Sequence, residues 1–273
     1  MSGQLASGGL GVESLTRVEG AAFPDGLLQL DYRSPVDGLA DWAMLLPPPS
    51  GSTWLVCIHG HGARGNQLYL RNDIRKAWLP SFLLRGYGLL TPTLRGNAWM
   101  SPAAVADMDA LIDYLRREWG ATRFIFASGS MGGTSNLIYA SLRPVNVQAV
   151  AAMGAIADLA AYHEFCRRGA SRLTILGEIA DSLEEHYGGS PAQQPELYRR
   201  HSPLYHCEAL LRMPLFLAHG TADLLMPVAQ SRRLTGALAE HECFCYHEIA
   251  DGGHDAPLHM DPCEFIAEKM SNA

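Results

Sequence analysis

One segment of the sequence has the side chains that a serine nucleophile requires. The predicted buried strand Phe124–Ala127 leads through Ser128 and Gly129 to Ser130, and Gly132 follows two residues later. A nucleophile on a tight strand-to-helix turn needs small residues two positions before and after it, because the backbone there folds back on itself. Ser130 meets this requirement, although Ser128 stands where the pattern G-x-S-x-G has its first glycine. We therefore expect Ser130 to be a nucleophile.

Two neighbouring serines fail the same test. Phe126 would occupy the tight position before Ser128, and Leu137 would occupy the tight position after Ser135. The alternative interpretation of the whole segment is a Gly/Ser loop that caps a helix. Ser130 is the serine that the steric requirement favours.

A second segment predicts a binding site for an oxyanion. Val56–Gly62 is a buried strand that ends in the pattern H-G-x-G. Glycines allow backbone N–H groups to turn inward, where they bind the negative charge that develops beside a nucleophile. We expect the amides of His61 and Met131 to be the donors.

The same loop offers a metal site as an alternative. His59 and His61 form an H-x-H pair, which zinc enzymes use. No Asp-His follows at the spacing that metallohydrolases favour, and Arg64 would repel a cation. We therefore expect these histidines not to bind zinc.

Two later segments supply an acid and a base. The predicted strand Leu215–His219 leads into H-G-x-x-D, which ends at Asp223. A carboxylate there can hold an imidazole in the required tautomer and stabilise the imidazolium, and Asp158, after the preceding strand, is the alternative acid. The loop after the last strand presents His254 between glycines and an acid, as a general base requires. His259 is interpreted as structural.

The elements that must position these residues alternate along the chain. Apolar runs predict buried strands at Trp54–His59, Gly88–Pro92, Phe124–Ala127, Val147–Met153, Leu215–His219 and Cys243–Ile249. Helical patterns lie at Leu68–Leu84, Ala103–Trp119, Thr134–Leu142, Val228–Ala239 and Glu264–Met270. Such alternation indicates an α/β fold with a mostly parallel sheet, whose ligands bind beyond the carboxyl ends of the strands.

Two segments depart from this alternation. Leu27–Arg33 and Trp42–Leu46, on either side of Asp37-Gly38, predict an antiparallel hairpin. Residues 157–206 separate two strands that a single helix could join, and they include a predicted helix at Leu173–His186. We expect a single domain over residues 1–273 with a small mobile helical cap at 157–206 that selects substrates; an ordinary crossover helix is the alternative.

The composition excludes several classes of protein. The 273 residues are 48% apolar and 18% charged, which allows a large core and argues against disorder. A net charge of -7 repels nucleic acid and anionic membrane surfaces alike. The first ten residues lack the basic and apolar regions of a secretory signal, no apolar run is long enough to span a membrane, and we expect a cytoplasmic protein. The six cysteines form no C-x-x-C pair and are expected to be reduced thiols.

The order of the candidate residues supports a resemblance to a known superfamily. Ser130, Asp223 and His254 follow one another as nucleophile, acid and base, the order expected for an α/β-hydrolase. The resemblance extends from Tyr32 to Met270. Within it, three stretches resemble the catalytic domain of prolyl oligopeptidase-like enzymes and related esterases: Tyr32–Gly38, Leu94-Arg95-Gly96 and Ser202-Pro203. The large N-terminal propeller of those peptidases is not expected here.

The resemblance implies a fold and a reaction. The sheet would be flanked by helices on both faces, and acyl transfer would proceed through an acyl-Ser130 intermediate without a metal or an organic cofactor. His254 would take the Ser130 proton, return it to the leaving group and later activate water. We expect a hydrolase of small to medium carboxylic esters, with a small-molecule partner.

Two other functions stay open at this point. A prolyl oligopeptidase-like peptidase or aminoacyl amide hydrolase would use the same three residues on an amide. A catalytically inactive binding protein would keep the same fold without turnover. The sequence leaves open the acyl and alcohol groups of the substrate and the oligomeric state.

Overall fold

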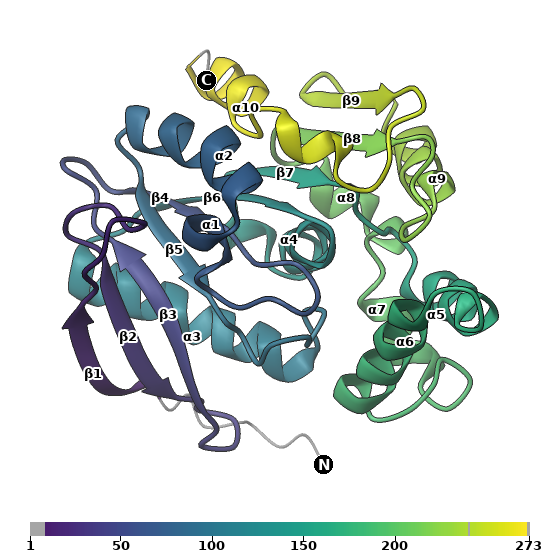
Figure 1. Cartoon of the computed structure of the whole chain (residues 1–273), viewed down its shortest axis with the longest axis horizontal. Coiled ribbons are helices and arrows are strands. Elements are labelled where there is room, and N and C mark those ends of the chain that lie inside the picture. Colours follow the sequence, from purple (N-terminus) through teal and green to yellow (C-terminus); the bar gives the residue numbers. More distant parts are fainter. Residues whose placement is uncertain (1–8, 240, 272–273) are drawn as a thin grey trace.

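A computed structural model describes residues 9–239 and 241–271, and Figure 1 shows how their helices and strands are arranged. The first eight residues, part of the segment that we expect to hold no secretory signal, lie outside the described residues. Within the described part, no helix is long and apolar enough to cross a membrane. All six cysteines are free thiols, of which Cys57, Cys166 and Cys263 are buried.

A single mixed sheet forms the centre of the molecule. Over the described residues it has nine strands in the order β1-β2-β3-β5-β4-β6-β7-β8-β9. The strands are β1 (Gly11–Arg17), β2 (Leu28–Arg33), β3 (Ala40–Leu46), β4 (Thr53–Val56), β5 (Gly88–Pro92), β6 (Arg123–Gly129), β7 (Ala149–Met153), β8 (Leu215–Gly220) and β9 (Phe244–Ile249). Strands β4 to β9 pair in parallel, whereas β1, β2 and β3 pair antiparallel and join the sheet through β5. The predicted α/β fold with a mostly parallel sheet is confirmed.

Helices cover both faces of this sheet (Figure 1). The α-helices are α1 (Gln67–Leu70), α2 (Asn72–Leu84), α3 (Pro102–Trp119), α4 (Met131–Leu142), α5 (Leu159–Gly169), α6 (Thr174–Tyr187), α7 (Pro195–Arg200), α8 (Cys207–Leu210), α9 (Val228–Leu238) and α10 (Glu264–Ser271). Short 3-10 turns are η1 (Pro144–Asn146), η2 (Pro203–Tyr205) and η3 (Ala256–His259).

Two apolar clusters hold these layers together. One cluster joins α3, α4 and α9 to one face of the sheet, and the other joins α1, α2 and α10 to the opposite face. Strands β5, β7 and β8 are buried along their whole length, because parallel strands are covered by helices on both faces. This explains why these strands appear in the sequence as unbroken apolar runs.

The structure corrects the predicted helices at two places. The single helix predicted over Leu68–Leu84 is wrong, because Arg71 adopts an extended conformation with ψ 108° and separates α1 from α2. The helix predicted from Thr134 begins earlier, at Met131, directly after Ser130. The second correction matters for chemistry, because the first amides of a helix lack acceptors within that helix.

The antiparallel end of the sheet contains the predicted hairpin and one further strand. Strands β2 and β3 pair as expected, with Leu30 opposite Ala43, and Gly38 has a φ of 74° in the turn between them. Strand β1 was not predicted. It is an edge strand whose residues are exposed except at the half-buried Ser14, so it lacks the alternation that marks a half-buried strand.

The long connection between β7 and β8 contains α5, α6, α7, η2 and α8. We refer to residues 157–206 as the 157–206 insertion. Its helices α5, α6 and α7 lie to one side of the sheet, beyond the end of β7 (Figure 1). Helix α6 corresponds to the helix predicted at Leu173–His186, whereas α5 and α7 were not predicted. The buried apolar side chains of α6 belong to the same apolar cluster as those of α3 and α4, so the insertion packs against the main body.

Candidate active site

Ser130 lies in the sharp turn between β6 and α4. Its φ of 59° and ψ of -129° place it in a region that L-residues rarely adopt, and its N–H donates to the carbonyl of Met153 at 2.7 Å. A Cβ at Gly132 would overlap the carbonyl oxygen of Ile58. The requirement for a small residue two positions after Ser130 therefore has a direct steric cause.

Ser128 fills the small position before Ser130 and adds a hydrogen bond. It is fully buried, and its hydroxyl accepts the N–H of Ile58 at 2.8 Å. That contact ties the end of β6 to the chain that follows β4. A serine in place of the usual glycine therefore fits this turn because its hydroxyl satisfies a buried amide.

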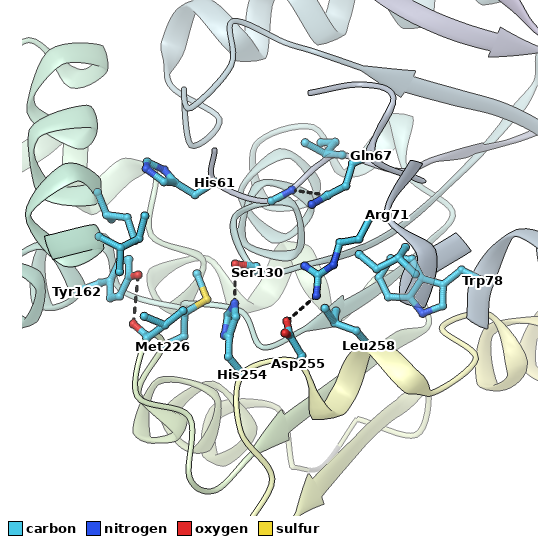
Figure 2. A pocket seen from close by; sticks show the side chains of 17 residues that line it. His61, Gln67, Arg71, Trp78, Ser130, Tyr162, Met226, His254, Asp255 and Leu258 are labelled. Carbon is cyan, nitrogen blue, oxygen red and sulfur yellow. Dashed lines mark hydrogen bonds and ion pairs between the residues drawn. The ribbon is translucent and has the colours of Figure 1, made fainter. Parts of the chain in front are cut away.

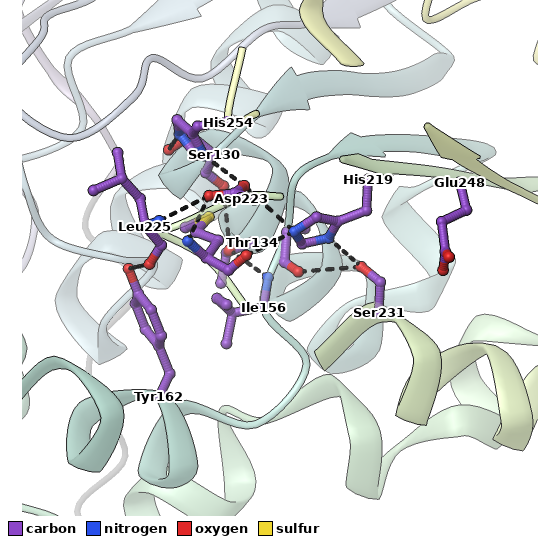
Figure 3. Close-up of polar contacts among 12 residues, drawn as sticks. Ser130, Thr134, Ile156, Tyr162, His219, Asp223, Leu225, Ser231, Glu248 and His254 are labelled. Carbon is purple, nitrogen blue, oxygen red and sulfur yellow. Dashed lines mark hydrogen bonds and ion pairs between the residues drawn. The ribbon is translucent and has the colours of Figure 1, made fainter. Parts of the chain in front are cut away.

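His254 and Asp223 lie next to Ser130 (Figure 3). His254 Nε2 is 3.0 Å from Ser130 Oγ, and His254 Nδ1 is 2.8 Å from Asp223 Oδ2. The His254 loop approaches the end of β8 so closely that a Cβ at Gly220 would overlap the carbonyl oxygen of Gly252. The three residues whose order predicted a nucleophile, an acid and a base are thus in hydrogen-bond contact.

Asp223 is held in its ionised form by several donors. Its Oδ1 accepts the N–H groups of Leu225 and Met226 at 2.8 and 2.9 Å, and its Oδ2 lies 3.4 Å from His219 Nε2 in addition to His254. Burial alone would raise the pKa of this carboxyl group. The hydrogen bonds from His219, His254 and the Met226 amide outweigh burial and bring the pKa well below its ordinary value.

Asp158, the alternative acid, and His259, the histidine interpreted as structural, lie away from this chain of contacts. Asp158 is the N-cap of α5, where its Oδ1 accepts the N–H of Ala161 at 3.1 Å and its Oδ2 contacts Arg233 at 3.2 Å. His259 lies in η3 with its side chain exposed. The structure brings His254 to Asp223 rather than to Asp158.

The H-G-x-G loop approaches Ser130 from the end of β4. A Cβ built on Gly60 would lie 3.9 Å from Ser130 Cβ. The Gly60 N–H donates to Gln67 Oε1 at 2.8 Å, and the Gly62 N–H donates to Asn97 Oδ1 at 2.7 Å. Within the described residues, the amide between them, that of His61, has no such acceptor, and the same is true of Met131 at the start of α4. Neither amide is therefore occupied by a protein acceptor among the described residues, as a donor to an oxyanion requires.

Gln67 and Asn97 were missed in the sequence analysis. Each side chain holds one glycine amide of the loop, so each shapes the loop although neither lies in a recognisable motif. Gln67 is the first residue of α1, and Asn97 follows the stretch Leu94-Arg95-Gly96. Their spacing in the sequence carries no signal, because the contacts form only when the loops meet.

The two histidines of the H-x-H pair do not face a common point. His59 is buried, and its ring nitrogens lie 2.8 Å from the carbonyl oxygens of Gly60 and Thr93. His61 Nδ1 accepts a hydrogen bond from Trp99 Nε1 at 3.3 Å, and burial lowers the pKa of His61 to about 4. Over the described residues, no group of three or more His, Cys, Asp or Glu side chains is arranged to hold a metal ion.

A pocket of about 280 Å³ opens over Ser130 and His254 (Figure 2). Trp78 and Leu258 lie on one side of Ser130, and Tyr162 and Met226 lie on the other. The remaining apolar lining residues are Ile58, Ile74, Ile175, Ile179 and Leu225. The pocket is therefore mostly apolar around a small polar centre, as is usual for small-molecule sites.

One ion pair forms part of the pocket wall. Arg71 lies 2.9 Å from Asp255, the residue after His254, and 2.8 Å from Asp73. Arg71 and Asp255 both line the pocket. The break between α1 and α2 at Arg71 is thus part of the site.

Comparison with known proteins gives one family match and a set of similar folds. The sequence model of the family described as BD-FAE matches residues 45–238. That range includes Ser130, Asp223 and the 157–206 insertion, but it ends before His254. No curated protein matches the chain in sequence.

Several solved structures share the fold at low sequence identity. The chain is similar to FphF, a fluorophosphonate-binding serine hydrolase of Staphylococcus aureus, with 15% identity, a TM-score of 0.65 and coverage of 91% of this chain and 97% of that one. An S-formylglutathione hydrolase from Agrobacterium tumefaciens has 13% identity and a TM-score of 0.64, with coverage of 95% and 98%. A puromycin-hydrolyzing peptidase of Mycobacterium tuberculosis has 20% identity and a TM-score of 0.62, over 85% of this chain. This chain spans only 36% of that peptidase.

Proposed function

The chain belongs to the BD-FAE family and has the α/β-hydrolase fold, and on that premise we propose that it is a hydrolase that cleaves carboxylic esters through an acyl-enzyme on Ser130. The observation that carries this proposal is the chain of contacts from Ser130 Oγ to His254 at 3.0 Å and from His254 to Asp223 at 2.8 Å. A hydroxyl, an imidazole and an ionised carboxylate in this sequence form an activated nucleophile.

In the first half of the reaction, Ser130 Oγ attacks the ester carbonyl carbon. Its proton passes to His254 Nε2, and Asp223 stabilises the imidazolium that results. The carbonyl oxygen becomes an oxyanion and accepts hydrogen bonds from the amides of His61 and Met131. The bond between the acyl carbon and the leaving oxygen then breaks. His254 gives its proton to that oxygen, so an alcohol departs and the acyl group remains on Ser130.

The second half repeats these steps with water. His254 takes a proton from a water molecule, and the hydroxide forms a bond to the acyl carbon. The bond to Ser130 Oγ then breaks, and the serine recovers its proton from His254. The product is a carboxylic acid, and the enzyme returns to its starting state. Every proton moves through His254 Nε2, and this mechanism uses no metal or organic cofactor.

The pocket supports a small to medium substrate. Its volume of about 280 Å³ lies at the low end of ligand sites, and its walls are mostly apolar apart from the ion pair of Arg71 and Asp255. Because α5 and α6 contribute Tyr162, Ile175 and Ile179 to the lining, we propose that the 157–206 insertion acts as a mobile cap on a single domain.

Hydrolysis of an amide is the second candidate, because the same three residues can attack it and one structure of similar fold is a puromycin-hydrolyzing peptidase. The test compares p-nitrophenyl esters from acetate to octanoate with the corresponding p-nitroanilides. We expect turnover of the shorter esters and much slower turnover of the anilides. Preference for the anilides would favour the amide hydrolase, and turnover of neither class would contradict the proposed function.

Two serine variants make this test specific. Ser130→Ala is expected to lower ester kcat by about a thousandfold or more, because the nucleophile is lost while binding remains. Ser135→Ala is the matched control, because Ser135 is a buried serine of α4 that does not belong to the pocket lining. It should keep wild-type kcat. Comparable loss in both variants would indicate damage to α4 rather than loss of a nucleophile.

A further inference from the structure

The segment between β5 and α3, Leu94–Ser101, has an unusual backbone. We call it the 94–101 loop. Leu94, Arg95, Trp99 and Met100 have φ angles of 49°, 63°, 47° and 53°. L-residues other than glycine rarely adopt such values, because they strain the backbone. Four such residues in one loop need contacts from outside the loop to hold them.

One side of this loop contacts the H-G-x-G loop beside Ser130. Asn97 Oδ1 accepts the N–H of Gly62 at 2.7 Å. Trp99 Nε1 donates to His61 Nδ1 at 3.3 Å, and the two rings lie 6.0 Å apart. These contacts are made to His61, whose amide the proposed mechanism uses, and to Gly62, the residue after it. The 94–101 loop therefore holds the H-G-x-G loop on the far side of His61 from Gln67, which binds the Gly60 amide.

The other side of the loop is held by the 157–206 insertion. Three backbone carbonyls of the 94–101 loop accept hydrogen bonds from side chains of the insertion. Ser182 Oγ donates to the Asn97 carbonyl at 2.8 Å, and Tyr187 OH donates to the Trp99 carbonyl at 2.9 Å. His201 Nδ1 lies 3.0 Å from the Met100 carbonyl and donates to it.

These contacts are buried and specific. Trp99, Tyr187 and His201 are each at most 3% exposed, so a carbonyl that lost its donor would have no water to replace it. The ring of Trp99 also packs 5.5 Å from that of Tyr162 in α5. The insertion thus supplies donors to two of the residues with positive φ, Trp99 and Met100.

We propose that the 157–206 insertion positions the oxyanion-binding loop through the 94–101 loop, with Tyr187 and Ser182 as positioning residues. This inference rests on the proposed function, because it assigns the insertion a part in stabilising the oxyanion. When the insertion is seated, its donors hold the strained loop, and the strained loop holds His61 and Gly62. When the insertion moves away, the carbonyls of Asn97, Trp99 and Met100 lose these donors, and the His61 amide loses its alignment.

The test removes the hydrogen-bond donors of the insertion one at a time and compares the kinetics of each variant with those of the wild-type protein. Tyr187→Phe keeps the ring but removes the donor to Trp99. We expect kcat for a short p-nitrophenyl ester to fall about ten-fold while KM stays within about two-fold, because the lost alignment weakens a bond to the transition state. Ser182→Ala should move kcat in the same direction.

Tyr198→Phe is the matched control. Tyr198 is also a fully buried tyrosine of the insertion, but its hydroxyl donates to the Gly189 carbonyl within the insertion at 3.1 Å. Its kcat should stay within about two-fold of wild type. An unchanged kcat in Tyr187→Phe, a change in KM alone, or an equal fall in Tyr198→Phe would overturn the proposal.

A second measurement needs no substrate and separates this inference from the proposed function. The Gly62 amide, which donates to Asn97, should exchange with deuterium about five-fold faster or more in Tyr187→Phe than in wild type, and at the wild-type rate in Tyr198→Phe. Equal exchange in the two variants would overturn the inference. If the wild-type protein hydrolysed no ester, the proposed function would fail, and this exchange measurement would still decide the link between the loops.

Discussion

At the scale of single residues, the environment of Asp223 distinguishes it from the other candidate acid. Its two carboxylate oxygens meet the amides of Leu225 and Met226 and the imidazoles of His254 and His219. Donors on both oxygens keep a buried carboxylate ionised and fixed in direction. One carboxylate oxygen of Asp158 accepts a hydrogen bond from an amide in the first turn of α5, as the side chain of an N-cap residue usually does.

These environments predict different effects for the same substitution. Asp223→Asn is expected to lower kcat on the order of 10³- to 10⁴-fold, because an amide facing His254 favours the wrong imidazole tautomer. Asp158→Asn should change kcat little, since asparagine is also a good N-cap. Steady-state kinetics with a p-nitrophenyl ester measure both. A larger loss in Asp158→Asn would transfer the acid role to Asp158.

The residues that carry the proposed chemistry could be predicted because the residues next to them in the sequence show a recognisable pattern. Ser130 lies between small residues that the turn requires, and Asp223 and His254 each follow a strand. Residues that hold the candidate catalytic side chains in place could not be predicted in this way. His219 was treated as part of the strand before Asp223, although its imidazole contacts the carboxylate, Ser231 and the Met226 carbonyl.

At the scale of elements, apolar patterning predicted the buried strands. It failed to predict elements whose side chains are exposed, or whose buried side chains include polar ones. Strand β1 is exposed along nearly its whole length and has no pattern to read. Helix α5 buries Leu159, Tyr162, His163 and Cys166, which are spaced i, i+3, i+4 and i+7 as in an amphipathic helix. That pattern was present in the sequence, but a histidine and a cysteine among its four members weaken the apolar signal.

The proposed cap gives a prediction at this scale. Ile179 of α6 lines the pocket, so Ile179→Ala should raise kcat/KM for bulky acyl esters relative to short ones, by about three-fold or more. Leu183, one turn further along α6, is fully buried and does not belong to the pocket lining. Leu183→Ala is therefore the control, which should lower Tm without changing the ranking of substrates.

Kinetics across an acyl series and thermal unfolding of both variants separate the two roles of α6. A changed ranking only in Ile179→Ala would support a substrate-selecting cap. If Ile179→Ala lowered Tm and left the ranking unchanged, α6 would be an ordinary core helix, and the proposed cap would be wrong.

At the scale of the whole molecule, the parallel part of the sheet explains why residues far apart in sequence meet. Strands β4, β6 and β8 run in the same direction, and the H-G-x-G loop, Ser130 and Asp223 each follow one of them. Elements that follow parallel strands gather at one edge of the sheet. The position of the site could therefore be predicted from the order of strands and helices alone.

The shape of the pocket could not be predicted in the same way. Its walls combine α2, η3, the insertion and the turn after β8, which contributes Leu225 and Met226. No single segment shows in the sequence which side chains will face the others across the cavity.

The formation of an acyl-enzyme tests the central claim most directly. The protein is mixed with p-nitrophenyl butyrate, quenched in acid during turnover, and digested for mass spectrometry. We expect the mass of one butyryl group, less the displaced hydrogen, on the peptide that contains Ser130, and no such adduct in Ser130→Ala. Ester turnover without an adduct in any quenched sample, or an adduct on a residue other than Ser130, would contradict the account.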